Sequence, residues 1–438
     1  MLDFDDLHDY QLDAIAAMED TNEAIVWCGL GGGKTAIALT LIARLGLNAV
    51  VFSTKRIIEY VWPAEIEKWE HLKGLTYRAC SGTPKQRFKA IEEAPQILGV
   101  SFDNLKWYTE QPDPFCRPIV VFDEISKMKA TGTQRFKAWK KAREQYIHLY
   151  GLTATPATES YLGLFGQYKA IVTEPILGRT LTQFRETYTT PIFKGMFTTY
   201  EVGPLQKRAI EAAIAPYTII VKDDLKRPEP TVIDVPVAWS RASEKSYRDM
   251  EKKFVLELEE HGLIHAASAG AARMKCRTLA SGFLYHEKAP IEIDRMKLDA
   301  IVEEVEALGG EPVLIAYQFL AEKDVLLRAI PGAEPLEGDA YQRFDRGEIP
   351  ALVVHPKSCG HGLNLQGACR HVFWSSLPES LEDYLQTNGR IDRQGQKKQV
   401  VIKRFVREKS IDTDILVPQL AGKEINMVEL IQRMRGRG

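Results

Sequence analysis

This sequence lacks the features of a secreted, membrane-bound or zinc-dependent protein. Its six cysteines are scattered with no Cys-x-x-Cys pair, which argues against a zinc site and for a reducing cytoplasm. No apolar run approaches the length that crosses a bilayer. The acidic start, Met1 to Asp6, carries no signal-peptide pattern. We therefore expect a cytoplasmic protein that does not bind membranes.

The chain also has little net charge, −2 over 438 residues, which argues against a uniformly basic nucleic-acid binder. Basic residues are nevertheless clustered. Residues 126–143 hold seven Lys or Arg and no acid, and residues 390–409 hold eight against two acids. Such runs are either solvated surface or a track for nucleic-acid phosphates. We favour the track, because each run adjoins a nucleotide-site motif.

The most informative stretch is a glycine-rich loop that ends in Lys34 and Thr35. The apolar run Ala24–Val26 predicts a buried strand before it, and Ala36–Leu45 predicts a helix after it. Strand, loop and helix in this order bind phosphates through backbone N–H groups. Lys34 is expected to reach the β- and γ-phosphates, and Thr35 to hold Mg²⁺. The alternative is a glycine-rich helix cap. The predicted phosphate-binding residues are Gly29, Leu30, Gly31, Gly32, Gly33, Lys34 and Thr35.

Two carboxylates, Asp123 and Glu124, follow the apolar run 118–122. Acids at the carboxyl end of a parallel strand lie at the sheet edge where ligands bind. Asp123 is expected to hold Mg²⁺, and Glu124 to accept a proton from the attacking water. The alternative is an exposed acidic turn.

Two further groups complete a predicted ATP site. Gln11, just upstream of the first strand, has an amide that can read adenine because it donates and accepts at once. Arg390 and Arg393 are three residues apart, so we expect both on one face of a helix. Arginines there would stabilise charge on the transferred phosphoryl group.

Strands and helices alternate along the chain, which predicts parallel α/β sheets. The charged, proline-rich stretch 226–230 is the predicted linker, giving domains at 1–225 and 226–438. The second domain has no glycine loop of its own. Its predicted strands are Pro312–Tyr317, Ala351–His355, His371–Trp374 and Val400–Phe405.

With these motifs in this order, the chain resembles superfamily 2 helicase-type ATPases, among them the Swi/Snf-type DNA translocases and most of all their short bacteriophage versions. The matching segments are Leu7, Tyr10 and Gln11 (Q motif), Gly29–Thr35 (I), Asp123-Glu124 (II), Leu152–Pro156 (III), Ser358–Leu365 (V) and Gln386–Gln396 (VI). One departure follows motif II, where this chain has Ile125-Ser126 and that family usually has Ala-His.

The resemblance implies an α/β fold of two RecA-like lobes with parallel sheets and ATP in the cleft between them. Residues 1–225 would form the ATP-binding lobe, and residues 226–438 the helicase lobe. The implied catalytic residues are Lys34, Asp123, Glu124, Gln386, Arg390 and Arg393. Tyr10, Gln11 and Gly362 would join the phosphate loop in binding nucleotide. The implied DNA contacts are Ser53, Thr54, Lys55, Ser81, Gly82, Thr83, Ser358, Cys359 and Gly360.

The function this implies is a DNA-dependent ATP hydrolase that uses ATP and Mg²⁺ to move along double-stranded or branched DNA without sequence preference. Its task would be to remodel or branch-migrate replication or recombination intermediates, with other replication or recombination proteins as candidate partners. We expect a monomer in the cytoplasm, which would be the host's if the source is a bacteriophage. One alternative is a strand-separating DNA or RNA helicase. Another is an ATP-gated binding protein with little turnover.

Overall fold

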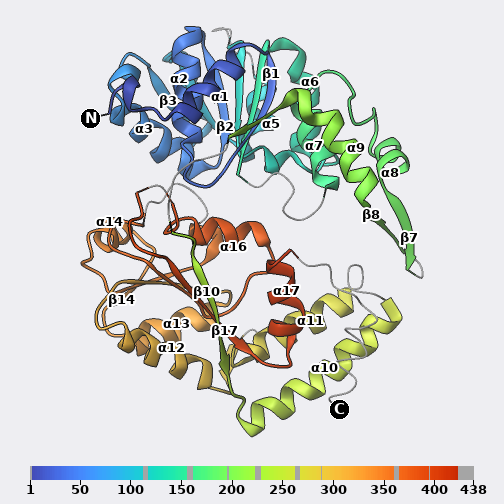
Figure 1. Ribbon diagram of the computed structural model, residues 1–438, viewed down its shortest axis with the longest axis vertical. Helices are drawn as coiled ribbons and strands as arrows, with labels where there is room; N and C mark the ends of the chain where they lie inside the picture. Colours follow the sequence, from blue (N-terminus) through green and yellow to red (C-terminus); the bar gives the residue numbers. More distant parts are fainter. Residues whose placement is uncertain are drawn as a thin grey trace. The chain divides into compact units, whose positions relative to one another are not determined.

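The chain divides into two compact units, each built on a parallel β-sheet. The first comprises Met1–Ile192 and Thr199–Leu225, and the second Phe193–Thr198 and Lys226–Gly438. The two parallel sheets confirm the predicted α/β class (Figure 1). Among the described residues, no helix is both long and apolar enough to cross a membrane. This computed structural model describes residues 2–111, 117–154, 161–194, 197–221, 228–261, 267–287, 289–359, 365–393 and 395–422.

The sheet of the first unit has seven strands, and all neighbouring strands run parallel. In spatial order they are β3 (Tyr77–Cys80), β4 (Ile97–Ser101), β2 (Ala49–Ser53), β5 (Ile119–Asp123), β6 (His148–Thr153), β1 (Glu23–Cys28) and β9 (Thr218–Val221). The helices are α1 (Asp9–Glu19), α2 (Lys34–Leu45), α3 (Trp62–Lys68), α4 (Pro84–Glu92), α5 (Leu105–Thr109), α6 (Gln134–Ala142), α7 (Leu162–Ile171), α8 (Leu181–Tyr188) and α9 (Pro204–Ile214).

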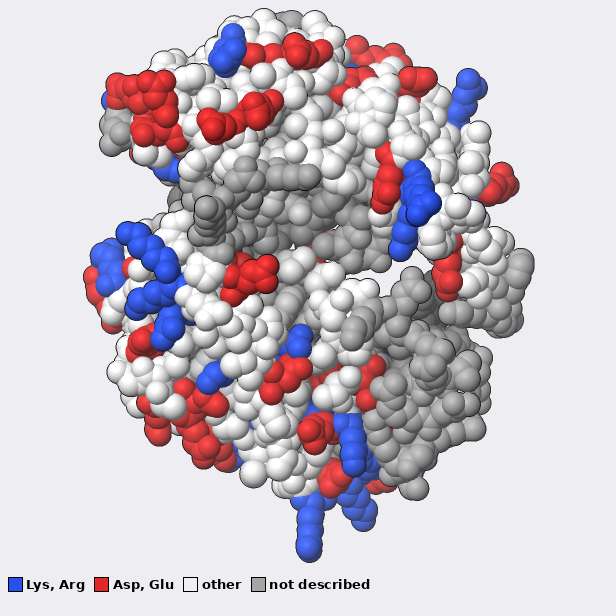
Figure 2. All heavy atoms as spheres, viewed as in Figure 1, with Lys and Arg blue, Asp and Glu red and all other residues white. Residues whose placement is uncertain are grey.

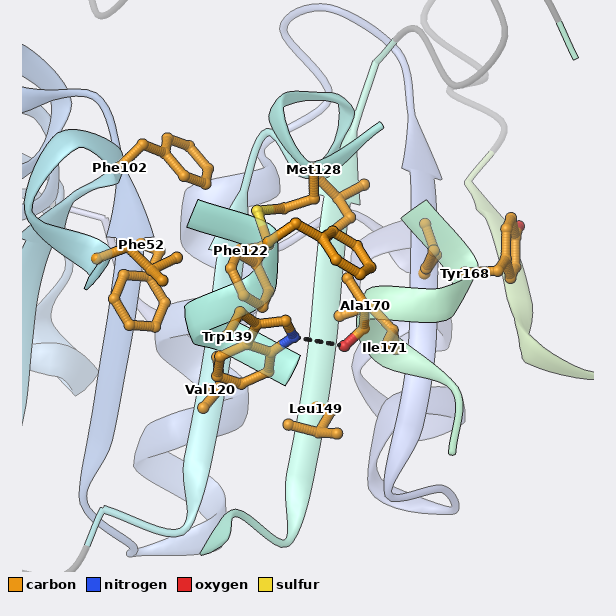
Figure 3. Packing of buried hydrophobic residues seen from close by; sticks show 14 of the residues in the cluster. Phe52, Phe102, Val120, Phe122, Met128, Trp139, Leu149, Tyr168, Ala170 and Ile171 are labelled. Carbon is orange, nitrogen blue, oxygen red and sulfur yellow. Dashed lines mark hydrogen bonds between the residues drawn. The ribbon is translucent and has the colours of Figure 1, made fainter. Parts of the chain in front are cut away.

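The central strands β4, β2 and β5 of this sheet are buried on both faces. Successive side chains of a strand point to opposite faces, so each strand contributes to two hydrophobic clusters. On β5, Val120 and Phe122 belong to one hydrophobic cluster, and Ile119 and Val121 to the other. The first cluster is covered by helices that include α6 and α7, and the second by helices that include α1 and α2. Figure 3 shows the first, where the indole of Trp139 on α6 donates to the Ala170 carbonyl of α7 at 2.8 Å.

The order of strands decides which loops meet. Strand β6 lies between β5 and β1, and the three run parallel. Their last residues, Cys28, Asp123 and Thr153, therefore end at the same edge of the sheet. This carboxyl edge is where ligands bind in open parallel sheets.

The second unit has a six-stranded parallel sheet. Its order is β10 (Thr231–Val237), β17 (Val401–Arg407), β16 (His371–Trp374), β13 (Val313–Ala316), β15 (Ala351–Val354) and β14 (Ala333–Pro335). The helices are α10 (Arg241–His261), α11 (Ala267–Ala280), α12 (Met296–Ala307), α13 (Leu320–Ala329), α14 (Ala340–Asp345), α15 (Pro356–Cys359), α16 (Leu381–Asn388) and α17 (Val417–Leu420). Two-stranded sheets are formed by β7 (Thr190–Lys194) with β8 (Phe197–Glu201), and by β11 (Phe283–His286) with β12 (Ala289–Glu292).

Candidate active site

The loop between β1 and α2 has a backbone that requires glycine. Gly31 and Gly33 have φ of 80° and 79°, a left-handed region that side chains disfavour. A Cβ on Gly33 would also lie 2.0 Å from Nε2 of Gln11. Gly33 is the N-cap of α2, so the loop leads directly into a helix N-terminus, the part of a helix that attracts anions.

The predicted phosphate ligands Lys34 and Thr35 are the first two residues of α2. The Lys34 ammonium donates to the carbonyls of Cys28 at 3.0 Å and Gly29 at 3.1 Å, so it lies over the loop. Neutral carbonyls compete weakly with an anion for an ammonium group, since charge-assisted hydrogen bonds are the stronger kind. The loop and Lys34 together fit a phosphate group.

The side chain of Gln11 bonds to the glycine loop between β1 and α2. Its side chain is buried, accepts from the His8 N–H at 2.9 Å and donates to the Gly32 carbonyl at 3.4 Å. Its neighbour Tyr10 stacks on His8, with ring centroids 5.2 Å apart. In this arrangement Gln11 holds the loop, and its predicted reading of adenine stays a prediction.

Asp123 is the last residue of β5 and is buried. Its Oδ2 accepts from Nε1 of Trp62 at 3.0 Å. Burial raises the pKa of Asp123, whereas the Trp62 hydrogen bond, the charge of Lys34 and the Ser53 hydroxyl all favour its ionised form. The structure thus brings Lys34 and Asp123 within electrostatic reach, as an ATP site requires.

Glu124 has a strained backbone and a fixed carboxylate. Its φ is 82°, which costs a non-glycine residue on the order of 1–3 kcal/mol. The strained turn is held by the Glu124 N–H, which donates to the Leu152 carbonyl at 3.0 Å. The hydroxyl of Thr153 donates to Glu124 Oε1 at 2.6 Å. Motif III therefore contacts the predicted base directly.

The departure at Ile125 has a local explanation. Ile125 is buried in the hydrophobic cluster on one face of the sheet. It lies against Gly151 of β6, where a Cβ would come within 3.0 Å of the Ile125 side chain. Gly151 thus leaves room for a residue larger than the alanine usual at this position.

In the second unit, the prediction that Arg390 and Arg393 share a helix face is wrong. Helix α16 ends at Asn388 with Gly389 as its C-cap, and both arginines lie in the turns that follow. Gln386, still on the helix, is buried and donates to Glu382 Oε1 at 3.1 Å.

These turns are tied to the end of motif V. The Leu365 N–H donates to the Arg390 carbonyl at 3.1 Å, and Gln396 Nε2 donates to the Cys369 carbonyl at 2.9 Å. The predicted residues Gly360 and Gly362 lie outside the described residues.

The predicted DNA contacts divide into buried and exposed groups. The side chains of Ser53 and Cys359 are fully buried, so we place neither on a DNA-binding surface. Lys55 is exposed, with Glu59 at 3.8 Å. The remaining described residues, which are at least partly exposed, are Thr54, Ser81, Gly82, Thr83 and Ser358.

The basic run 126–143 is only partly available to DNA. Arg135 pairs with Asp103 at 3.2 Å, and Arg143 pairs with Glu23 at 3.3 Å and donates to the Ile171 carbonyl at 2.6 Å. On the face shown in Figure 2, lysines and arginines stand singly or in small groups among acids. Two of the seven basic side chains of the run are therefore held by contacts within the first unit.

Two residues of the site were missed by sequence reasoning. Thr153 was placed in motif III, whose threonines were expected to link the γ-phosphate state to the rest of the molecule, but its bond to Glu124 was not predicted. Its place one strand away from Glu124 follows once the strand order is known. Trp62 contacts Asp123 across 61 positions, and no local pattern predicts so distant a bond.

No protein-family model matches this sequence. Among solved structures, the chain is similar to the Sulfolobus solfataricus SWI2/SNF2 ATPase core in complex with dsDNA, with 17% identity and a TM-score of 0.45, covering 95% of this chain and 91% of that one. It is 30% identical over 436 residues to protein p41 of Acyrthosiphon pisum secondary endosymbiont phage 1, covering 93% of this chain and 94% of that protein. The phage source agrees with the resemblance to short bacteriophage proteins. The chain belongs to the same protein family as phage protein p41.

Proposed function

We propose that this protein is a Swi/Snf-type, DNA-dependent ATPase of superfamily 2 that translocates on duplex DNA. One observation carries the ATPase part. A glycine loop with Lys34 and an acid pair at Asp123 and Glu124 share the carboxyl edge of one parallel sheet, and the Lys34 charge acts on Asp123. The DNA part is supported by the order of motifs along the whole chain.

In this proposal the first unit binds ATP. The loop N–H groups and Lys34 bind the phosphates, and Glu124, oriented by Thr153, accepts a proton from the attacking water. Thr35 and Asp123 would hold Mg²⁺, which when bound neutralises charge on the phosphates. Asp123 suits this role, because its Oδ1 accepts no hydrogen bond from the described residues while Oδ2 does.

The second unit supplies Gln386, Arg390 and Arg393 to the reaction, with the arginines stabilising charge on the transferred phosphoryl group. The residues proposed for the DNA backbone are at least partly exposed, among them Lys55 on the helical turn after β2 and Ser81–Thr83 in the loop after β3. Backbone contacts carry no sequence information, so the motor moves on any duplex. The proposed task is to remodel or branch-migrate replication or recombination intermediates.

Phosphate release from ATP, measured without nucleic acid and with duplex DNA, single-stranded DNA, forked DNA or RNA, tests the proposal. We expect duplex DNA to stimulate turnover most, and Glu124→Gln to abolish that stimulation. Stimulation by RNA alone would overturn the DNA assignment. Tight ATP binding without turnover on any nucleic acid would favour the ATP-gated binding protein instead.

A further inference from the structure

Trp62 makes a buried contact with Asp123. Its Nε1 donates to Oδ2 at 3.0 Å, and both residues are buried. The Ser53 hydroxyl donates to the Asp123 carbonyl at 3.2 Å and lies 3.5 Å from Oδ2, a distance at which it adds little. Trp62 is thus the main donor to this carboxylate, and it engages one of the two oxygens.

A local irregularity of the backbone directs the indole to this place. A π-helical turn, Ile57–Val61, precedes α3, and the Trp62 N–H bonds to the carbonyl of Ile57, five residues back. The proline at position 63 explains the turn, because it has no N–H for an α-helical bond and its ring crowds the carbonyl four residues back. The turn takes in one residue more than an α-helical turn, which changes the direction of the side chains that follow.

The π turn is anchored to the sheet. The Tyr77 hydroxyl on β3 donates to the Ile58 carbonyl at 2.5 Å. Gly99 on β4 makes room for this contact, since a Cβ there would lie 2.1 Å from the Tyr77 oxygen and 3.0 Å from Ile58. The segment that carries Trp62 is therefore fixed to the sheet by these contacts, as a precise site requires.

We propose that Trp62 is a positioning residue for Asp123: its N–H holds Oδ2 and so presents Oδ1 to the divalent cation. This inference rests on the proposed ATPase function and names the residue that orients the cation ligand. Donors that hold a metal-binding side chain in place typically change metal affinity or activity by about 10- to 100-fold when they are removed. A purely structural role would instead change stability and leave cation affinity alone.

The test removes only the indole N–H. Trp62 is replaced by β-(3-benzothienyl)alanine, a tryptophan analogue with sulfur in place of N–H, and separately by Phe. The matched control is Trp69→Phe. Trp69 is also buried, and it donates to the Glu65 carboxylate at 2.7 Å from the same segment of chain. Mn²⁺ affinity is measured by electron paramagnetic resonance with a non-hydrolysable ATP analogue, and analogue binding is measured separately in EDTA.

We expect both Trp62 variants to weaken Mn²⁺ binding by about 10- to 100-fold while metal-free nucleotide binding stays at the parent level, because Lys34 and the loop are unchanged. The control should bind Mn²⁺ like the parent. Parent-like Mn²⁺ affinity in the benzothienyl variant would overturn the inference and leave the proposed function standing. A parent protein that binds no Mn²⁺ together with the nucleotide would overturn the proposed function, and the inference with it.

Discussion

At the scale of single residues, the account depends on distinct roles for Lys34 and Glu124. Lys34→Ala should weaken nucleotide binding and abolish hydrolysis, because the phosphates lose their principal cation. Glu124→Gln should keep nucleotide binding and lower turnover by about two orders of magnitude or more, because the base is lost while Asp123 remains. Equilibrium binding and phosphate-release assays separate these effects. Near-parent turnover in Glu124→Gln would show that another group is the base.

The hydrogen bond from Thr153 to Glu124 gives a second prediction at this scale. Thr153→Val keeps the shape of the side chain and removes the hydroxyl that donates to Glu124 at 2.6 Å. We expect turnover to fall by about tenfold or more, the equivalent of roughly 1.5–3 kcal/mol for a hydrogen bond to a charged group, with the KM for ATP little changed. Thr153→Ser, which keeps a hydroxyl, should retain most of the parent activity. Equal rates for the two variants would count against the role of the hydroxyl.

At the scale of elements, a buried ion pair joins β17 to the segment before α12. Arg407 and Asp294 are 2.9 Å apart, and both side chains are fully buried. Burial acts to raise the pKa of Asp294, but the Ser243 hydrogen bond and the charge of Arg407 bring it below its usual value. A lowered carboxyl pKa stabilises the fold above the unfolded-state value near 4, and that contribution is lost as the pH falls through the folded-state value.

Asp294→Ala should therefore destabilise the second unit by roughly 3–5 kcal/mol, because it leaves a buried arginine uncompensated. Denaturant unfolding at neutral pH measures the change. The matched control is Asp234→Ala on β10. It removes the ion-pair partner of Arg404, which lies on β17 like Arg407, and the pair is 2.6 Å apart with the Asp234 side chain 40% exposed. We expect the control to cost about 1 kcal/mol or less. Equal effects of the two variants would contradict the account.

Strands with uninterrupted apolar runs were the easiest to predict. The apolar run 118–122 lies largely in β5, Ile119–Asp123, whose residues are all buried, since a strand covered on both faces leaves a continuous signal. Predicted Val400–Phe405 corresponds to β17, Val401–Arg407, although Lys403 and Arg404 interrupt its apolar run. Strand β4 was missed because Gly99 interrupts its apolar run. A glycine is needed there because a Cβ would collide with the Tyr77 side chain of the neighbouring strand β3. Strand β10 was missed because it contains Pro236, which is tolerated there because β10 is an edge strand.

The end of α16 did have a sequence signal. Asn388-Gly389 is a typical helix stop, and the Asn388 side chain accepts from the Trp374 indole at 2.9 Å. The spacing of Arg390 and Arg393 suggested that both lie on one helix face, but the helix ends at Asn388, before either arginine. The glycine loop before α2 and the acid pair at the end of β5 were predictable because each is a stretch of adjacent residues. The contacts of Trp62 and Thr153 depend instead on how segments distant in sequence pack together.

At the scale of the whole molecule, the proposal requires a contribution from the second unit to hydrolysis. Arg393→Ala should leave ATP affinity nearly intact and lower turnover by roughly a thousandfold, the size typical of a lost arginine finger. Arg328→Ala, a change of an exposed arginine on α13 of the same unit, outside the predicted motifs and both basic runs, should retain turnover. An unchanged rate in Arg393→Ala would mean that the first unit hydrolyses ATP without this arginine.

The most direct test of the central claim is ATP-driven displacement of a third strand from duplex DNA. A motor that grips phosphates and moves along a duplex pushes off whatever lies in its path without melting base pairs. We predict that the protein displaces the third strand with ATP, that Glu124→Gln does not, and that a plain forked duplex is unwound poorly. Efficient unwinding of the fork without triplex displacement would contradict the translocase account and favour the strand-separating helicase.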